Sequence, residues 1–200
     1  MFLKTSIFRK LCKEAWRGGG LFLHCENGVY IIYGRYWQVE VGVEELTNAE
    51  KAAIIELAGE MPQEGEHFKA FKSDKHSYIQ QIFRDEGRFP HEPISESFRS
   101  EGVFTPITIN GSLEMAVIRD KKSQDCYCVP RIVKQMITNE QDDTDPDPWG
   151  PVRGSNLIAW TNNITTVITT VHDYQDEEWQ QGFLYFLKEV DLGERYADEV

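Results

Sequence analysis

The chain has 200 residues, of which 40% are hydrophobic and 27% are charged, and its formal net charge at pH 7 is −12. This composition is that of an ordinary globular protein with a sizeable core, and it excludes wholesale disorder. No apolar run reaches the roughly 18–20 residues of a membrane span, and the N-terminus lacks the apolar segment of a signal peptide. We therefore expect a cytoplasmic protein with no membrane partner and without a generally basic surface.

The sequence pattern of residues 1–62 predicts a first βαββα unit. Residues 2–4 read as a short strand, and apolar residues then recur at helical spacing. The hydroxyl of Thr5 is suited to cap this helix, and Gly18–Gly20 ends it.

The rest of this unit is a hairpin, a strand and a helix. Asn27-Gly28 lies between two apolar runs, which is the strongest local signal for a tight hairpin turn. Alternating apolar residues predict a third strand over 36–43. A helix over 49–61, capped by Thr47 or Asn48, follows.

Residues 63–125 predict an irregular insertion followed by a second hairpin. The first part is charged and has no sustained period, with one helix expected over 76–83. Strands over 104–109 and 113–119 are expected to join across Asn110-Gly111.

Residues 126–190 predict a second βαββα unit, and residues 191–200 form an acidic tail. The unit is expected to contain a strand over 126–129, a helix that begins with Pro130, strands over 156–160 and 164–171, and a helix over 177–190. The acidic stretch 140–147 is expected to be a surface loop.

The fold class predicted is α+β: an antiparallel sheet with helices on one side, built from two related strand–helix–hairpin–helix units. Apolar positions coincide when residues 2–12 are aligned with 127–137, residues 22–34 with 157–169, and residues 54–61 with 183–190. Any two stretches with this order of elements would show a similar coincidence. Residues expected in the core are Ile7, Leu11, Ile32, Trp37, Ile55, Leu57, Ile132, Met136, Val167, Phe183 and Leu187.

The sequence offers no motif for catalysis, a cofactor or a metal. Its four cysteines lack Cys-x-x-Cys spacing, and its five histidines form no metal-binding pair, so neither zinc nor redox chemistry is expected. Gly18–Gly20 follows a helix instead of opening one, which argues against a phosphate loop. We expect a protein that is not an enzyme and has no cofactor.

The opening of the chain resembles a known family. Residues 1–5 (MFLKT), followed by Phe8, Lys10-Leu11 and Ala15, look like the first strand and helix of sliding-clamp modules, the processivity factors of DNA polymerases. Those modules are duplicated units whose helices line a DNA channel. The resemblance covers the two predicted units and implies a clamp-like fold and a role on DNA.

Basic residues on the predicted helices agree with a DNA-facing surface. Arg9, Lys13 and Arg17 are four residues apart and share one helical face, with Lys10 beside them. Arg131 and Lys134 lie in the second unit. Lysine and arginine bind phosphates without reading bases, so these six residues are the candidate DNA-binding residues. A charged outer face is also what any amphipathic helix would carry.

Two functions remain open from the sequence. The first is a clamp-like protein associated with DNA replication, of phage or mobile-element origin, that binds duplex DNA without sequence preference as a homo-oligomer. The second is an acidic module that binds or inhibits another protein by imitating DNA. Its candidate acids are Glu44, Glu45, Asp142, Asp143, Asp176, Glu177 and Glu178.

Overall fold

A computed structural model describes residues 2–72, 77–81, 100–137, 149–154, 156–162, 164–171 and 178–190. The helices are α1 (Thr5–Arg17), α2 (Asn48–Ala58), α4 (Arg131–Met136) and α5 (Glu178–Glu189). The strands are β1 (Leu21–Glu26), β2 (Val29–Tyr33), β3 (Trp37–Gly42), β4 (His67–Lys72), β5 (Ser77–Gln81), β6 (Ser100–Ile109), β7 (Met115–Asp120), β8 (Cys126–Pro130), β9 (Trp149–Arg153), β10 (Leu157–Thr161) and β11 (Thr165–Thr170).

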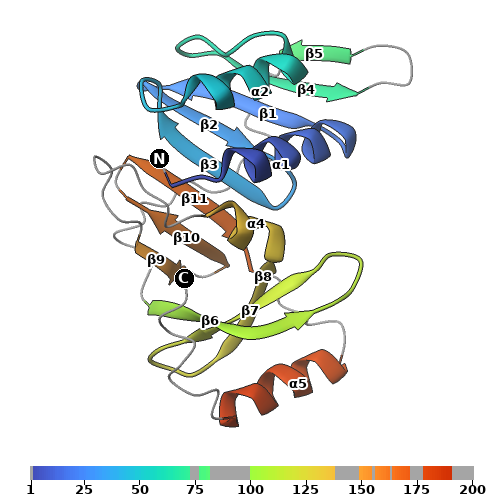
Figure 1. Cartoon of the computed structure of the whole chain (residues 1–200), viewed down its shortest axis with the longest axis vertical. Helices are drawn as coiled ribbons and strands as arrows, with labels where there is room; N and C mark the ends of the chain where they lie inside the picture. The colour runs from blue at the N-terminus through green and yellow to red at the C-terminus, as the bar shows by residue number, and fades with distance from the viewer. Residues whose placement is uncertain are drawn as a thin grey trace.

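The eleven strands form one antiparallel sheet in the order β5-β4-β1-β2-β3-β11-β10-β9-β6-β7-β8 (Figure 1). The predicted α+β class with a large antiparallel sheet is confirmed. The two halves of the chain meet where β3 pairs with β11, from Trp37 opposite Thr169 to Val41 opposite Thr165.

The first hairpin forms as its sequence predicts. Glu26 pairs with Val29, which leaves Asn27 and Gly28 as a two-residue turn with φ values of 53° and 73°. Both residues adopt positive φ, as a turn that matches the right-handed twist of the strands requires. The side chain of Glu64 accepts hydrogen bonds from both turn amides, at 2.6 and 3.1 Å.

A buried carboxylate joins the starts of α1 and α2. Thr47 caps α2, as one of the two predicted alternatives, and forms a capping box with Glu50. Thr5 does not cap α1: the cap position is Lys4, and the Thr5 hydroxyl donates to Glu50 at 3.0 Å. Glu50 is 1% exposed, and the backbone amide and hydroxyl of Thr47 also donate to it. These three donors satisfy a carboxylate that would otherwise be costly to bury.

The main core lies between one face of the sheet and the helices α1, α2 and α4. From α1, Phe8 and Leu11 are fully buried, and the rings of Phe8 and Trp37 pack edge to face with centroids 6.1 Å apart. Figure 1 shows α1 beside α2 on one side and beside α4 on the other. This packing leaves the polar side of α1 outward.

Most of the predicted core residues are buried, with Ile55 as the exception. Ile55 is 43% exposed, whereas its neighbour Ile54 is fully buried. The buried stripe of α2 runs through residues 50, 53, 54, 57 and 58, and Ile55 falls outside it. Ile7, Ile132 and Phe183 are partly buried against the core clusters.

The helices do not all lie on one side of the sheet, so that part of the prediction is wrong. In β7 and β8, Ile118 and Tyr127 face the main core, whereas Val117 and Cys128 belong to a second cluster that contains Leu187 of α5. Successive residues of a strand point to opposite faces. Helix α5 therefore covers the opposite face of this part of the sheet.

Three segments differ from the predicted elements. Residues 77–81 form strand β5 and not the helix expected over 76–83, because they pair with β4. Strand β4, which pairs with β1, lies in the segment predicted to be irregular. Strand β9, which pairs with β10, was not predicted either. The predicted loop over 140–147 and the tail over 191–200 lie outside the described residues.

The strand order does not match the predicted alignment of the two units. That alignment placed the β1–β2 hairpin on β10–β11, but β11 borders the junction of the two halves and β2 lies one strand away from it. The order on the two sides of the junction is β3-β2-β1 and β11-β10-β9. The last helices differ as well, since α2 packs beside α1 and α5 packs on β8.

Replacing Leu11 with alanine tests the packing of α1. Leu11 is fully buried, so the substitution removes apolar contacts and leaves a cavity. We expect a loss of about 2–5 kcal/mol in the free energy of unfolding, measured by urea denaturation. The control Ile55→Ala should cost much less because Ile55 is 43% exposed. Equal losses in the two variants would contradict this placement of the helices.

Candidate nucleic-acid interface

The polar faces of α1 and α4 concentrate positive charge on an acidic protein. The two helices contain all six predicted DNA-binding residues and a single acid, Glu14. The whole chain has 33 acidic and 21 basic residues, so the remainder is strongly acidic. Because the apolar stripe of α1 packs inward, its four basic side chains are left at the surface.

Arg9 and Lys13 share one counterion. Both bind the carboxylate of Glu56 in α2, and the Lys13 Nζ lies 3.2 Å from Glu56 Oε1. The side chains of Arg9 and Glu56 are 51% and 45% exposed, so the contact lies in solvent. Hydrogen bonds from Arg9 and then Lys13 hold the pKa of Glu56 below its ordinary value.

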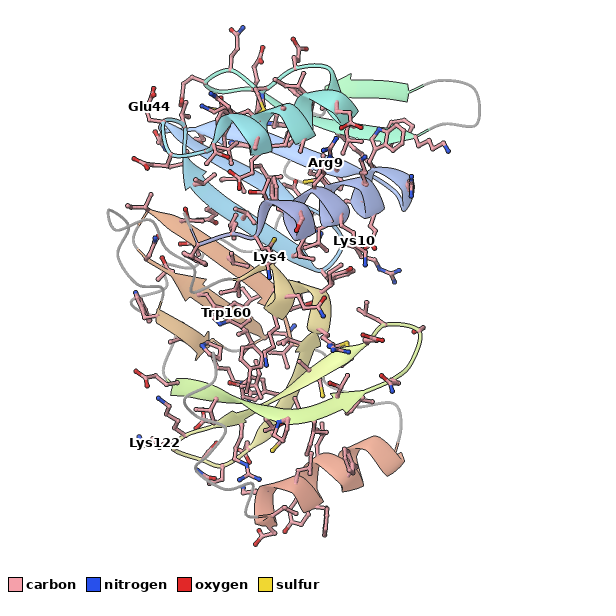
Figure 2. The ribbon with its side chains drawn as sticks, viewed as in Figure 1. Lys4, Arg9, Lys10, Glu44, Lys122 and Trp160 are labelled. Carbon is pink, nitrogen blue, oxygen red and sulfur yellow. The ribbon has the colours of Figure 1, made fainter. Side chains whose placement is uncertain are left out.

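Lys10 and Arg17 complete the basic face of α1. Figure 2 shows Arg9 on the side of α1 toward α2 and Lys10 on the opposite side, toward α4. The Lys10 Nζ lies 4.0 Å from Glu14 Oε1, which is a long ion-pair distance between two exposed side chains. Glu14 also accepts a hydrogen bond from the Tyr36 hydroxyl, and burial together with this carboxylate raises the pKa of Tyr36 to about 12. Arg17 is exposed in the last turn of α1.

The two basic residues of α4 differ in how available their side chains are to a ligand. Arg131 is exposed and pairs with Glu114 at 3.1 Å. The Lys134 Nζ lies 4.1 Å from the ring centroid of Phe104, a cation–π geometry. Burial, and then the charge of Arg131, lower the pKa of Lys134. Lys134 is therefore held against the core, and it is the least available of the six bases.

Backbone contacts fix α1 and α4 next to each other. The Lys4 amide donates to the Met136 carbonyl at 2.6 Å, and Leu3 forms an isolated antiparallel bridge with Ile137. The end of α4 therefore meets the start of α1. The bases of both helices consequently belong to one side of the molecule.

This surface has the chemistry of a phosphate-binding face. Arginine and lysine side chains on rigid helices contact phosphates without base readout. Glu56 and Glu114, which pair with three of the six bases, were not predicted from the sequence. Glu56 is more than 40 residues from its partners along the chain, so only the packing of α2 against α1 reveals it. Lys4, an exposed base at the start of α1, was not predicted either.

A second surface feature contains acids of the alternative function. Glu44, Glu45 and Glu64 line a cavity of about 640 Å³ together with Tyr30 and Met61. Among the described residues, no lysine or arginine lines this cavity. Of the other acids proposed for DNA imitation, Asp142, Asp143, Asp176 and Glu177 lie outside the described residues.

In the described part of the chain, no group of three or more histidine, cysteine, aspartate or glutamate side chains is arranged to hold a metal ion. Among the helices described, none is both long and apolar enough to span a membrane.

Comparison with solved structures finds DNA polymerase sliding clamps. The clamp from Pseudomonas aeruginosa matches 88% of this chain at 12% identity and a TM-score of 0.37. The DNA polymerase III β subunit from Thermotoga maritima matches 90% at 12% identity and a TM-score of 0.38. A β subunit from Eubacterium rectale, described as putative, matches 88% at 11% identity and a TM-score of 0.40.

The chain spans 64–66% of the length of these three clamps. They are the same class of protein that its opening residues resemble. No protein-family model matches the chain. No curated protein sequence matches it either.

The pKa of Glu56 tests whether Arg9 and Lys13 share it in solution. In Arg9→Gln/Lys13→Gln, we expect this pKa to rise toward about 4.3, the value of a free glutamate. In the wild type, the ion pairs stabilise the fold above that pH, and their contribution is lost as the pH falls through the lowered pKa. An NMR pH titration of the Glu56 carboxyl group measures the shift.

The control for this titration is Arg131→Gln, which removes a base that pairs with Glu114 instead. It should leave the pKa of Glu56 unchanged. An unchanged pKa in the double variant would show that the three side chains do not meet in solution.

Proposed function

We propose that this protein is a non-enzymatic, clamp-like factor of DNA replication that binds duplex DNA through α1 and α4 without sequence preference. One observation carries the proposal: six basic residues and one acid on two adjacent helices of a chain with a net charge of −12. Phosphate binding needs such a concentration of positive charge and needs no base-reading side chains.

The interface that we propose is defined by Arg9, Lys10, Lys13, Arg17 and Arg131, with Lys134 at its inner edge. The bases with more than 40% of the side chain exposed, such as Arg9, Lys10 and Arg131, can reach phosphate oxygens directly. Lys134 adds positive potential from its place against Phe104.

We further propose that several copies act together. Net charge −12 opposes the approach of one copy to DNA, because long-range repulsion slows the encounter. Copies that aim their α1 and α4 faces at the same duplex would add their contacts and raise the affinity. A homo-oligomer is therefore part of the proposed function.

An internal repeat would explain why two helices carry this charge. We propose that α1 with β1, β2 and β3 is related to α4 with β9, β10 and β11. This assignment is supported by the mirrored strand order about the β3–β11 junction. It replaces the alignment of hairpins drawn from the sequence.

The acidic module remains the second candidate. Its support is the cavity of about 640 Å³ that Glu44, Glu45 and Glu64 line, with no basic side chain among its described lining residues. Such a surface would suit a basic segment of another protein. It lies away from α1 and α4, so the two candidates predict binding to different surfaces.

DNA affinity as a function of salt tests the proposed function. Each phosphate contact adds about 0.9 to the slope of log affinity against log salt concentration. If Arg9, Lys13 and Arg17 each contact a phosphate, they account for a slope of at most about −3. The triple alanine variant should lose this part of the slope, measured by fluorescence anisotropy on linear duplex DNA.

The matched control replaces three exposed lysines elsewhere, Lys72, Lys121 and Lys122, with alanine. It makes the same change in net charge, so it should keep most of the slope. The mass of the species in solution is measured in parallel. No measurable affinity for duplex DNA at about 50 mM salt, where electrostatic binding is strong, would refute the proposal and favour the acidic module.

A further inference from the structure

The contact of Glu56 with Arg9 and Lys13 has the form of an occupied anion site. One carboxylate from α2 takes up two basic side chains of α1, with the Lys13 Nζ 3.2 Å from one oxygen and Arg9 on the other. A phosphate group presents oxygens of the same charge to the same donors. The carboxylate therefore stands where a DNA phosphate would be held.

The packing of α2 does not need this contact. Ile54 is fully buried, Leu57 is 7% exposed, and the capping box at Thr47 fixes the start of the helix. The Glu50 carboxylate already links the two helices through Thr5. Exposed ion pairs add little to stability, so a structural role alone is a weak reason for the position of Glu56.

We propose that Glu56 is a built-in competitor: it occupies the site at which Arg9 and Lys13 would hold a DNA phosphate, and it lowers the affinity of the protein for DNA. This inference rests on the proposed function and adds a regulator to the same surface. Binding of a phosphate there requires Glu56 to withdraw, so every phosphate held by Arg9 or Lys13 replaces an internal ion pair. The result is weaker and less salt-dependent binding than the same surface would give without the charge of Glu56.

Removing the charge of Glu56 tests the proposal. In Glu56→Gln, the one negative charge that competes with phosphate at Arg9 and Lys13 is removed, so the salt slope for duplex DNA should become more negative by about 0.9. The affinity at about 50 mM salt should rise roughly tenfold or more. Adding Arg9→Ala and Lys13→Ala to this variant should abolish the increase. Thermal unfolding of each variant checks that the fold is kept.

The matched control is Glu101→Gln, which removes one exposed acid from an ion pair with Lys121, outside α1 and α4. It changes the net charge by the same amount and should leave the slope unchanged. If the wild type binds DNA and Glu56→Gln binds it with no steeper salt slope, the competitor role of Glu56 is overturned and the proposed function stands. Absence of binding in both proteins would instead refute the proposed function. Equal increases in Glu56→Gln and Glu101→Gln would assign the effect to net charge and overturn the competitor role.

Discussion

The pairing of β3 with β11 is the constraint on which the rest of the architecture depends. It joins strands that are more than 120 residues apart in the chain, through five opposed residue pairs. Val39 and Val167 face each other there and are fully buried beneath the helices. The Thr169 hydroxyl adds a hydrogen bond to the Tyr36 carbonyl at 2.7 Å. Without this junction, the strands beneath α1 and those beneath α4 would belong to separate sheets.

Local chemistry explains what the sequence could predict. The Asn27-Gly28 turn, the Thr47 cap and the inward stripe of α1 each depend on a few neighbouring residues, and all three form as expected. The bases of α1 were predicted as a surface group for the same reason, because helical spacing separates them from the apolar stripe.

The misses all depend on tertiary contacts. Strand β5 carries no strong local signal and forms by pairing with β4, and β9 likewise depends on β10. Ile54 and Ile55 are alike in chemistry, so only the orientation of α2 decides which is buried. The location of α5 on the opposite face and the pairing of Glu56 with α1 follow from the arrangement of distant elements. No spacing within a single helix could reveal them.

Distance decides which acids matter to the basic surface. At physiological ionic strength, charges are screened over about 8 Å, so most of the acidic surface acts only weakly on a phosphate held at α1. Glu56 lies within 4 Å of two of its bases, and Glu14 and Glu114 lie within 4 Å of one base each. These three carboxylates therefore outweigh the remaining acids in setting the local potential. An acidic protein can in this way present a basic surface whose local potential is set mainly by a few neighbouring side chains, while its net charge still slows the encounter with DNA.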